Sequence, residues 1–147
     1  MAMLKVLVRM LLVVMIGSSL AACGGEPVGF ASLPTYPTAT ELAAGQNSLA
    51  DTVVETMQSA MGDNLTAEVQ LYQLPGDADF AAVRRFYEEQ LVGGDWQSAT
   101  ELSTDSGTFS TAGWQRGGFA SEQVLMLGFI PPLLDGSPVL IVSLFSE

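Results

Sequence analysis

The sequence predicts an α+β fold, a two-layer sandwich in which two helices lie on one face of a mostly antiparallel sheet of four or five strands. Two stretches keep the three- and four-residue apolar spacing of helices, and the second half of the chain reads as strands separated by turn residues. Of 147 residues, 48% are apolar and 14% are charged, which excludes a chain that is disordered throughout. Each helix needs an apolar surface to cover, and the sheet supplies it.

The N-terminus carries the strongest local signal. Lys5 and Arg9 precede the unbroken apolar run 10–16, and a short polar break leads to Leu20-Ala21-Ala22-Cys23. This order resembles the signal peptide of bacterial lipoproteins, whose last four residues form the lipobox. The resemblance implies cleavage before Cys23, a lipid on its sulfur, and attachment to the extracytoplasmic face of the cell membrane. The alternative is an uncleaved anchor, but a spanning helix needs about 20 apolar residues and two charges interrupt this one.

Three parts follow from this signal: a signal peptide over residues 1–22, a lipidated tether over 23–38, and a single α+β domain over 39–147. The tether is rich in glycine and proline and lacks a helical period, and 14 extended residues reach about 45 Å. Its second half contains Phe30, Leu33 and Tyr36, which are apolar enough to lie on the domain instead.

The first element of the domain is a helix that begins after a cap at Asn47 or Ser48 and ends at Gly62-Asp63-Asn64. Ser48 and Asp51 approximate a capping box. The apolar positions of this helix are Leu49, Val53, Met57, Ala60 and Met61. Residues 66–74 then alternate between apolar and polar, which predicts a strand with one wet face.

A second helix follows the turn at Pro75-Gly76-Asp77. Asp77 or Asp79 can cap it, and Gly93-Gly94 ends it. Its apolar stripe is formed by Phe80, Val83, Tyr87 and Leu91.

The second half of the chain predicts four strands. Residues 96–102 and 108–115 flank a hairpin loop, and residues 121–130 and 138–145 are apolar on both faces. The last two are therefore central strands, or strands whose outer face is covered. The cover is either the segment from Phe30 to Tyr36 or a protein partner, including a second copy of the chain.

A second resemblance concerns residues 47–116. Its positions are Tyr72, Leu74-Pro75, Phe86-Tyr87, Leu91, Gly94 and Trp96, and they resemble a family of small uncharacterised bacterial lipoproteins. These are packing and turn residues, so the resemblance implies no activity.

Catalytic residue types are scarce. The chain has no histidine, and the mature part has no lysine, which excludes histidine-dependent triads, Schiff-base lysines and the phosphate-binding lysine. Asp77 and Asp79 fit helix capping better than metal binding. We therefore expect no metal, no cofactor and no enzyme activity. The mature chain carries a net charge of 3 − 16 = −13, which argues against nucleic acid as a partner and against attraction to anionic lipid.

Trp114 and Arg116 are the candidate binding residues. An indole beside a guanidinium can hold a ligand, although a core tryptophan next to a surface arginine is the favoured interpretation. The predicted function is a membrane-anchored, non-catalytic binding or envelope-structure module. A small carboxylate-dependent hydrolase and an apolar-ligand carrier remain the alternatives.

Overall fold

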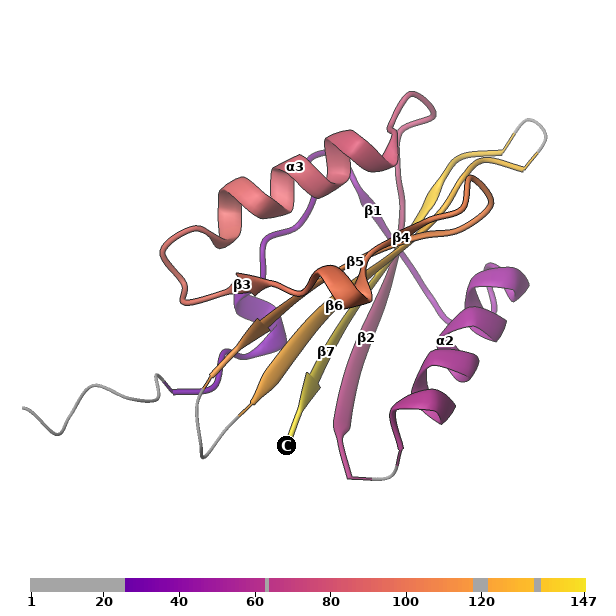
Figure 1. The fold of residues 1–147 in the computed structure, drawn as a ribbon. Coiled ribbons are helices and arrows are strands. Elements are labelled where there is room, and N and C mark those ends of the chain that lie inside the picture. The colour runs from indigo at the N-terminus through magenta and orange to yellow at the C-terminus, as the bar shows by residue number, and fades with distance from the viewer. Residues whose placement is uncertain (1–25, 63, 118–121, 134–135) are drawn as a thin grey trace, which may run out of the picture.

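A computed structural model describes residues 26–62, 64–117, 122–133 and 136–147. In these residues seven strands form one open sheet in the order β1-β2-β7-β6-β5-β3, with β4 also paired to β5, and every pairing is antiparallel (Figure 1). The strands are β1 (Thr40–Leu42), β2 (Thr66–Gln73), β3 (Gln97–Ser98), β4 (Thr104–Asp105), β5 (Ser110–Arg116), β6 (Gln123–Ile130) and β7 (Val139–Ser146). The predicted α+β class and antiparallel sheet are confirmed, although the sheet has seven strands rather than four or five.

Two α-helices in the described ranges flank the sheet, and the cap of each is one of the two residues that the sequence offered for it. The side-chain oxygen of Asn47 accepts the N–H of Ala50 at 3.0 Å at the start of α2 (Ser48–Met61). The carboxylate of Asp79 accepts the N–H of Ala82 at 2.7 Å at the start of α3 (Phe80–Leu91). The cap of α2 is therefore Asn47 and not Ser48, and Asp51 instead accepts the N–H of Gly45 at 3.0 Å.

The placement of the helices differs from the expectation, because they lie on opposite faces of the sheet (Figure 1). Leu140 and Val142 of β7 pack in the cluster that contains the apolar stripe of α3, whereas Val139 and Ile141 pack with Ala50 of α2. The reason is the alternation of side chains along a strand that is apolar on both faces. Such a strand needs cover on each side, and each helix supplies one. The molecule has three layers instead of two.

The central position of the last two strands is confirmed. β7 lies between β2 and β6, and β6 lies between β7 and β5. The face that we expected to need an external cover is the face beneath α2. Phe109 adds to the cover there, since its ring lies 3.1 Å from where a Cβ on Gly128 would stand.

The strand expected over residues 96–102 is wrong for most of its length. β3 has two residues, and a 3-10 turn, η2 (Thr100–Leu102), follows it. Leu102 lies on Gly113, where a Cβ would stand 2.6 Å from the Cβ of Leu102. The N–H of Ala99 donates to the carbonyl oxygen of Gly113 at 2.8 Å. Residues 99–102 therefore contact β5 through the Ala99 backbone and the Leu102 side chain, and they do not continue β3 as a strand.

The described part of the expected tether lies on the domain. Residues 26–38 run along the α3 side of the sheet and include a short 3-10 turn, η1 (Phe30–Ser32) (Figure 1). Phe30, Leu33 and Tyr36 pack against the cluster that α3 covers, and the rings of Tyr36 and Phe86 meet edge to face at 5.4 Å. The apolar residues of the segment had left this alternative open. The segment is not, however, the cover that we expected for the opposite face of the last two strands, because α2 covers that face.

Candidate functional site

One end of the sheet holds the N-terminal segment in place, and we call it the clamp end. It comprises Arg116 at the end of β5, Gln123 at the start of β6 and Ser146 at the end of β7. Gln123 is 2% exposed; its amide accepts the N–H of Val28 at 2.8 Å and donates to the carbonyl oxygen of Val28 at 2.9 Å. The same amide nitrogen donates to the hydroxyl of Ser146 at 3.0 Å.

Arg116 binds backbone oxygens of two distant segments. Its Nε donates to the carbonyl oxygen of Gly94 at 2.8 Å and its Nη1 to that of Glu26 at 2.9 Å. A hollow of about 160 Å³ lies beside it, lined by Asp95, Gln97, Gln115, Arg116, Gly117 and Glu122. The two carboxylates of this lining, Asp95 and Glu122, are exposed to solvent. The observed role of the guanidinium is to hold chain segments together.

Trp114 lies on the same face of β5 but in the core. Its side chain is 3% exposed, and its ring centroid is 6.3 Å from that of Tyr87. Since Arg116 is half-buried at the surface, the pair has the arrangement that the sequence favoured, a core tryptophan next to a surface arginine.

Tyr87 is the most perturbed titratable group of the described chain. It is fully buried, and its hydroxyl has no hydrogen-bond partner among the described residues. Burial raises the pKa of this hydroxyl well above its usual value, and the charge of Tyr72 raises it further. The neutral form is therefore strongly favoured in the fold.

The remaining candidates lie apart from one another. Asp79 caps α3 and Asp77 is exposed. Arg84 and Glu88 form an exposed ion pair, with Nε and Oε1 2.8 Å apart. No group of three or more acidic, histidine or cysteine side chains suited to a metal ion occurs in residues 26–62, 64–117, 122–133 and 136–147. No helix within those ranges is both long and apolar enough to cross a membrane. Cys23 lies outside the described residues.

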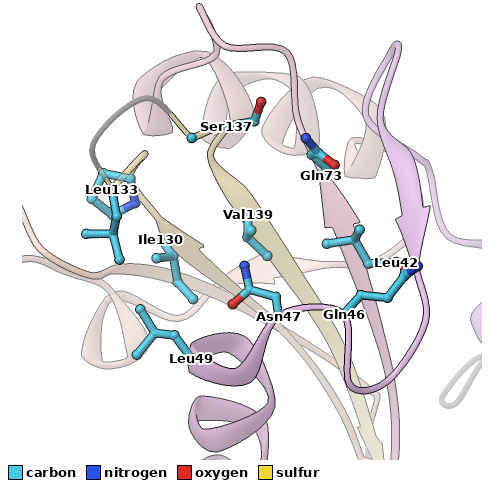
Figure 2. A pocket seen from close by; sticks show the side chains of 11 residues that line it. Leu42, Gln46, Asn47, Leu49, Gln73, Ile130, Leu133, Ser137 and Val139 are labelled. Atoms are coloured by element: carbon cyan, nitrogen blue, oxygen red, sulfur yellow. The ribbon is translucent and has the colours of Figure 1, made fainter.

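The opposite end of the sheet carries a pocket of about 220 Å³, which we call the distal pocket (Figure 2). Its walls come from the turn after β1, the start of α2, the end of β2 and the β6–β7 connection. The lining residues are Leu42, Gln46, Asn47, Leu49, Gln73, Ile130, Pro131, Leu133, Gly136, Ser137 and Val139. Leu49 and Leu133 are 44% and 63% exposed, so two large apolar side chains of the lining are open to solvent.

Of the amide side chains that line this pocket, those of Asn47 and Gln46 already accept a hydrogen bond through their oxygens. The oxygen of Asn47 caps α2, and that of Gln46 accepts the N–H of Ala43 at 2.7 Å. Figure 2 shows the Asn47 amide near the middle of the lining, with its nitrogen directed toward Val139. The pocket therefore combines apolar walls with an amide donor. Sequence reasoning missed it because its walls come from separate turns.

Comparisons with known proteins give no relative from which a site could be transferred. No family model, no curated protein and no solved structure matches this chain. The functional argument therefore rests on the residues of the chain and their geometry.

Proposed function

We propose that this chain is a lipid-anchored protein of the extracytoplasmic face of the cell membrane, and that its domain is a non-catalytic module that binds a protein partner. One observation carries the proposal. The lipobox cysteine, Cys23, precedes by three residues Glu26, whose carbonyl oxygen Arg116 holds at 2.9 Å. A lipid on Cys23 would therefore be joined to the folded domain by only three residues of chain.

The short connection supports a defined orientation. Three residues span at most about 11 Å, so a lipid on Cys23 keeps the clamp end close to the membrane. The acyl chains must provide the attachment, because the mature chain carries three basic residues against 16 acidic ones and is repelled by anionic head groups.

The distal pocket then faces the extracytoplasmic space. Gln123 pairs with Ser146 at the clamp end and Ile130 pairs with Val139 at the pocket. Seven residues of strand separate these rungs, which corresponds to about 24 Å. At this distance from the clamp end, a partner can reach the exposed Leu133 without touching the lipid surface.

The size of the distal pocket favours a side chain of a protein partner over a small molecule as its occupant. Sites for small molecules have about 300–1,000 Å³, and 220 Å³ suits one side chain of a partner better than an acyl chain or a sterol. This argues against the distal pocket as the site of an apolar-ligand carrier. A carboxylate-dependent hydrolase has less support, because the two carboxylates that line the hollow beside Arg116, Asp95 and Glu122, are exposed.

The lipid anchor is tested by mass spectrometry of the protein purified from membranes. We expect a mature N-terminus at Cys23 carrying acyl mass, and accumulation of the unprocessed chain for Cys23→Ser. Ser32→Ala is the control, because its exposed side chain lies beyond the lipobox, and it should be processed normally. A mature N-terminus elsewhere, or Cys23 without acyl mass, would refute the anchor.

The partner is tested by photo-cross-linking in intact cells. A photoreactive residue in place of Leu133 should give a protein adduct, and the same residue in place of Val92, which is 82% exposed on the C-terminal cap of α3, should not. Leu49→Ser in the pocket wall should abolish the adduct. No adduct at Leu133, or equal adducts at both positions, would contradict the proposal. An adduct with the mass of two chains would identify the homodimer that the sequence also suggested.

A further inference from the structure

The outer edge of β2 is open over more than half of its length. β2 runs from Thr66 to Gln73, but β1 pairs with its last three residues and ends where Leu42 meets Leu71. The chain then turns away through Ala43–Gln46, because it has to reach the cap of α2. Within the described ranges, no strand pairs with the outer edge of β2 from Thr66 to Gln70.

The hydrogen bonds at the end of β2 show which backbone groups face this edge. The N–H of Leu74 donates to the carbonyl oxygen of Pro138 at 2.9 Å, on the β7 side. In an antiparallel ladder the backbone groups of successive residues point alternately to the two neighbouring strands. The backbone N–H and C=O groups of the even-numbered residues of β2 therefore point toward β7. Those of Ala67 and Val69 point outward, away from β7. Such an edge is a template for another strand.

A groove of about 450 Å³ runs beside the open edge. Its floor includes Ala67 and Val69 of β2, and Val54 and Gln58 of α2 form the facing wall. A strand added to β2 would place every second side chain on the α2 face, directly in this groove. Ala67 and Val69 are half-buried, so apolar side chains opposite them would gain cover.

The surroundings of the edge are acidic. Glu41 and Asp51 line the groove, and Glu68 lies exposed at the middle of the open stretch. The basic side chains of the described ranges lie elsewhere: Arg84 and Arg85 are on α3, across the sheet, and Arg116 is on β5 at the clamp end. An incoming strand with basic side chains would therefore meet a complementary charge.

We propose that the open edge of β2 binds an extended segment of another protein by strand addition, antiparallel to β2 and in line with β1. The segment alternates apolar and basic residues. Its apolar side chains lie opposite Ala67 and Val69 in the groove, and a basic side chain lies opposite Glu68 on the other face. The proposal rests on the proposed function only in that the domain is a binding module; it requires neither the lipid nor the distal pocket.

A second copy of the chain is a poorer occupant. Two β2 edges that pair about a two-fold axis use both outward-facing residues when Ala67 of one copy meets Val69 of the other. This register sets Glu68 directly opposite Glu68, and like charges that face each other across a ladder are destabilising. The charge on Glu68 thus disfavours self-pairing and favours a basic partner.

The test uses the full chain purified in detergent and the capped peptide Lys-Val-Lys-Val-Lys as the probe. Strand addition should slow hydrogen exchange of the amides of Ala67 and Val69 at least about ten-fold, because both N–H groups become bonded. The matched probe is the same capped peptide with both valines N-methylated. The valine N–H groups are the ones that face β2, and an N-methylated amide cannot donate to the ladder, so this probe should leave the exchange unchanged. Peptide binding that leaves both amides unchanged would overturn the proposal.

Two substitutions separate backbone pairing from charge attraction. Ala67→Pro removes an outward N–H that the fold does not use and should weaken binding of the lysine probe at least about ten-fold. Ala67→Val keeps the N–H and should change binding by less than about two-fold. Glu68→Lys changes an exposed side chain, so it tests the proposal even if the proline variant does not fold. It should weaken the lysine probe and strengthen Glu-Val-Glu-Val-Glu.

Each remaining outcome contradicts the proposal. Equal binding by Ala67→Pro and Ala67→Val would mean that the backbone edge is not used. An unchanged preference of Glu68→Lys for the lysine probe would remove the charge argument. Protection of Ala67 and Val69 in a dimer without peptide, seen by sedimentation, would make a second copy the occupant. Acyl mass on Cys23, measured on the same sample, reports separately on the proposed function.

Discussion

Gln123 and Val28 are joined by two reciprocal hydrogen bonds across 95 residues of sequence. The side-chain amide of Gln123 thus imitates a strand neighbour for the backbone of Val28, and it does so from a buried position. These two hydrogen bonds therefore hold the N-terminal segment against the sheet at the clamp end.

Gln123→Ala should lower the free energy of unfolding by about 1–3 kcal/mol, because both bonds to Val28 are lost in a partly buried place. Hydrogen exchange of residues 26–36 should accelerate more than that of β6 and β7. Gln115→Ala is the matched control, since this glutamine is exposed on the neighbouring strand, and it should cost less than about 0.5 kcal/mol. Equal effects of the two variants would contradict a clamp.

The contact between Tyr36 and Phe86 gives a second test of the packed segment. Tyr36→Ala should destabilise the chain by about 1–3 kcal/mol, because it removes an edge-to-face ring pair and uncovers α3. In a double-mutant cycle with Phe86→Ala, the coupling should be about 0.5–1.5 kcal/mol. Thr35→Ala is the exposed neighbour and the control. Additive effects in urea unfolding would show that the segment does not pack on α3.

The sequence was sufficient for the elements whose signals are local. The caps could be narrowed to Asn47 or Ser48 and to Asp77 or Asp79, because a cap bonds within three residues of itself, and the structure has Asn47 and Asp79. The central position of β6 and β7 followed from their two apolar faces. β1 went unpredicted because three residues are too few to show a period.

The errors came from contacts between distant residues. Nothing near residue 102 in sequence shows that Leu102 fits on Gly113, so a continuous strand was expected where η2 forms. Likewise, the apolar stripe of a helix does not show which face of a sheet the helix covers, so α2 and α3 were wrongly expected on the same face. The distal pocket and the clamp also join segments far apart, so Arg116 could be singled out by its residue type but its bond to Glu26 could not be foreseen.

Tyr87 predicts a loss of stability in alkaline solution. Its hydroxyl is buried, so its pKa in the folded protein lies above that in the unfolded chain, where it is about 10. Below that value both states hold the proton and the group does not affect the pH dependence. As the pH rises further, the unfolded state releases the proton and the folded state keeps it, so the free energy of unfolding falls.

The expected fall from Tyr87 between pH 10 and pH 11.5 is about 1.6 kcal/mol, and its slope approaches that of one proton as the pH rises. Tyr87→Phe should remove this contribution, and at pH 8 it should be neutral or stabilising by up to about 1 kcal/mol, because it removes a hydroxyl without a partner in the described chain. Tyr36→Phe, which changes a half-buried tyrosine, should keep the alkaline loss. Urea unfolding at pH 8 and pH 11.5 decides between them, and an unaltered slope in Tyr87→Phe would refute the assignment.

The contact between Gly113 and Leu102 predicts a strong coupling between these two positions. A Cβ on Gly113 would stand 2.6 Å from the Cβ and 2.8 Å from the Cδ1 of Leu102, closer than side chains tolerate. Gly113→Ala should therefore destabilise the chain by about 1–3 kcal/mol, because η2 has to move off β5. Gly128→Ala is the milder control, since its nearest neighbour is the end of the Phe109 ring at 3.1 Å.

Leu102→Ala alone should cost about 1–2 kcal/mol, because it uncovers part of the α2-side face of β5. Combined with Gly113→Ala it should cost less than the sum of the two by at least about 0.5 kcal/mol, because the shorter side chain removes the Cδ1 that stands 2.8 Å from the new methyl group, while the Cβ at 2.6 Å stays. The free energies of unfolding of the two single variants and the double variant give this coupling directly. Additive losses would mean that Leu102 does not lie on Gly113, and η2 would then need another explanation.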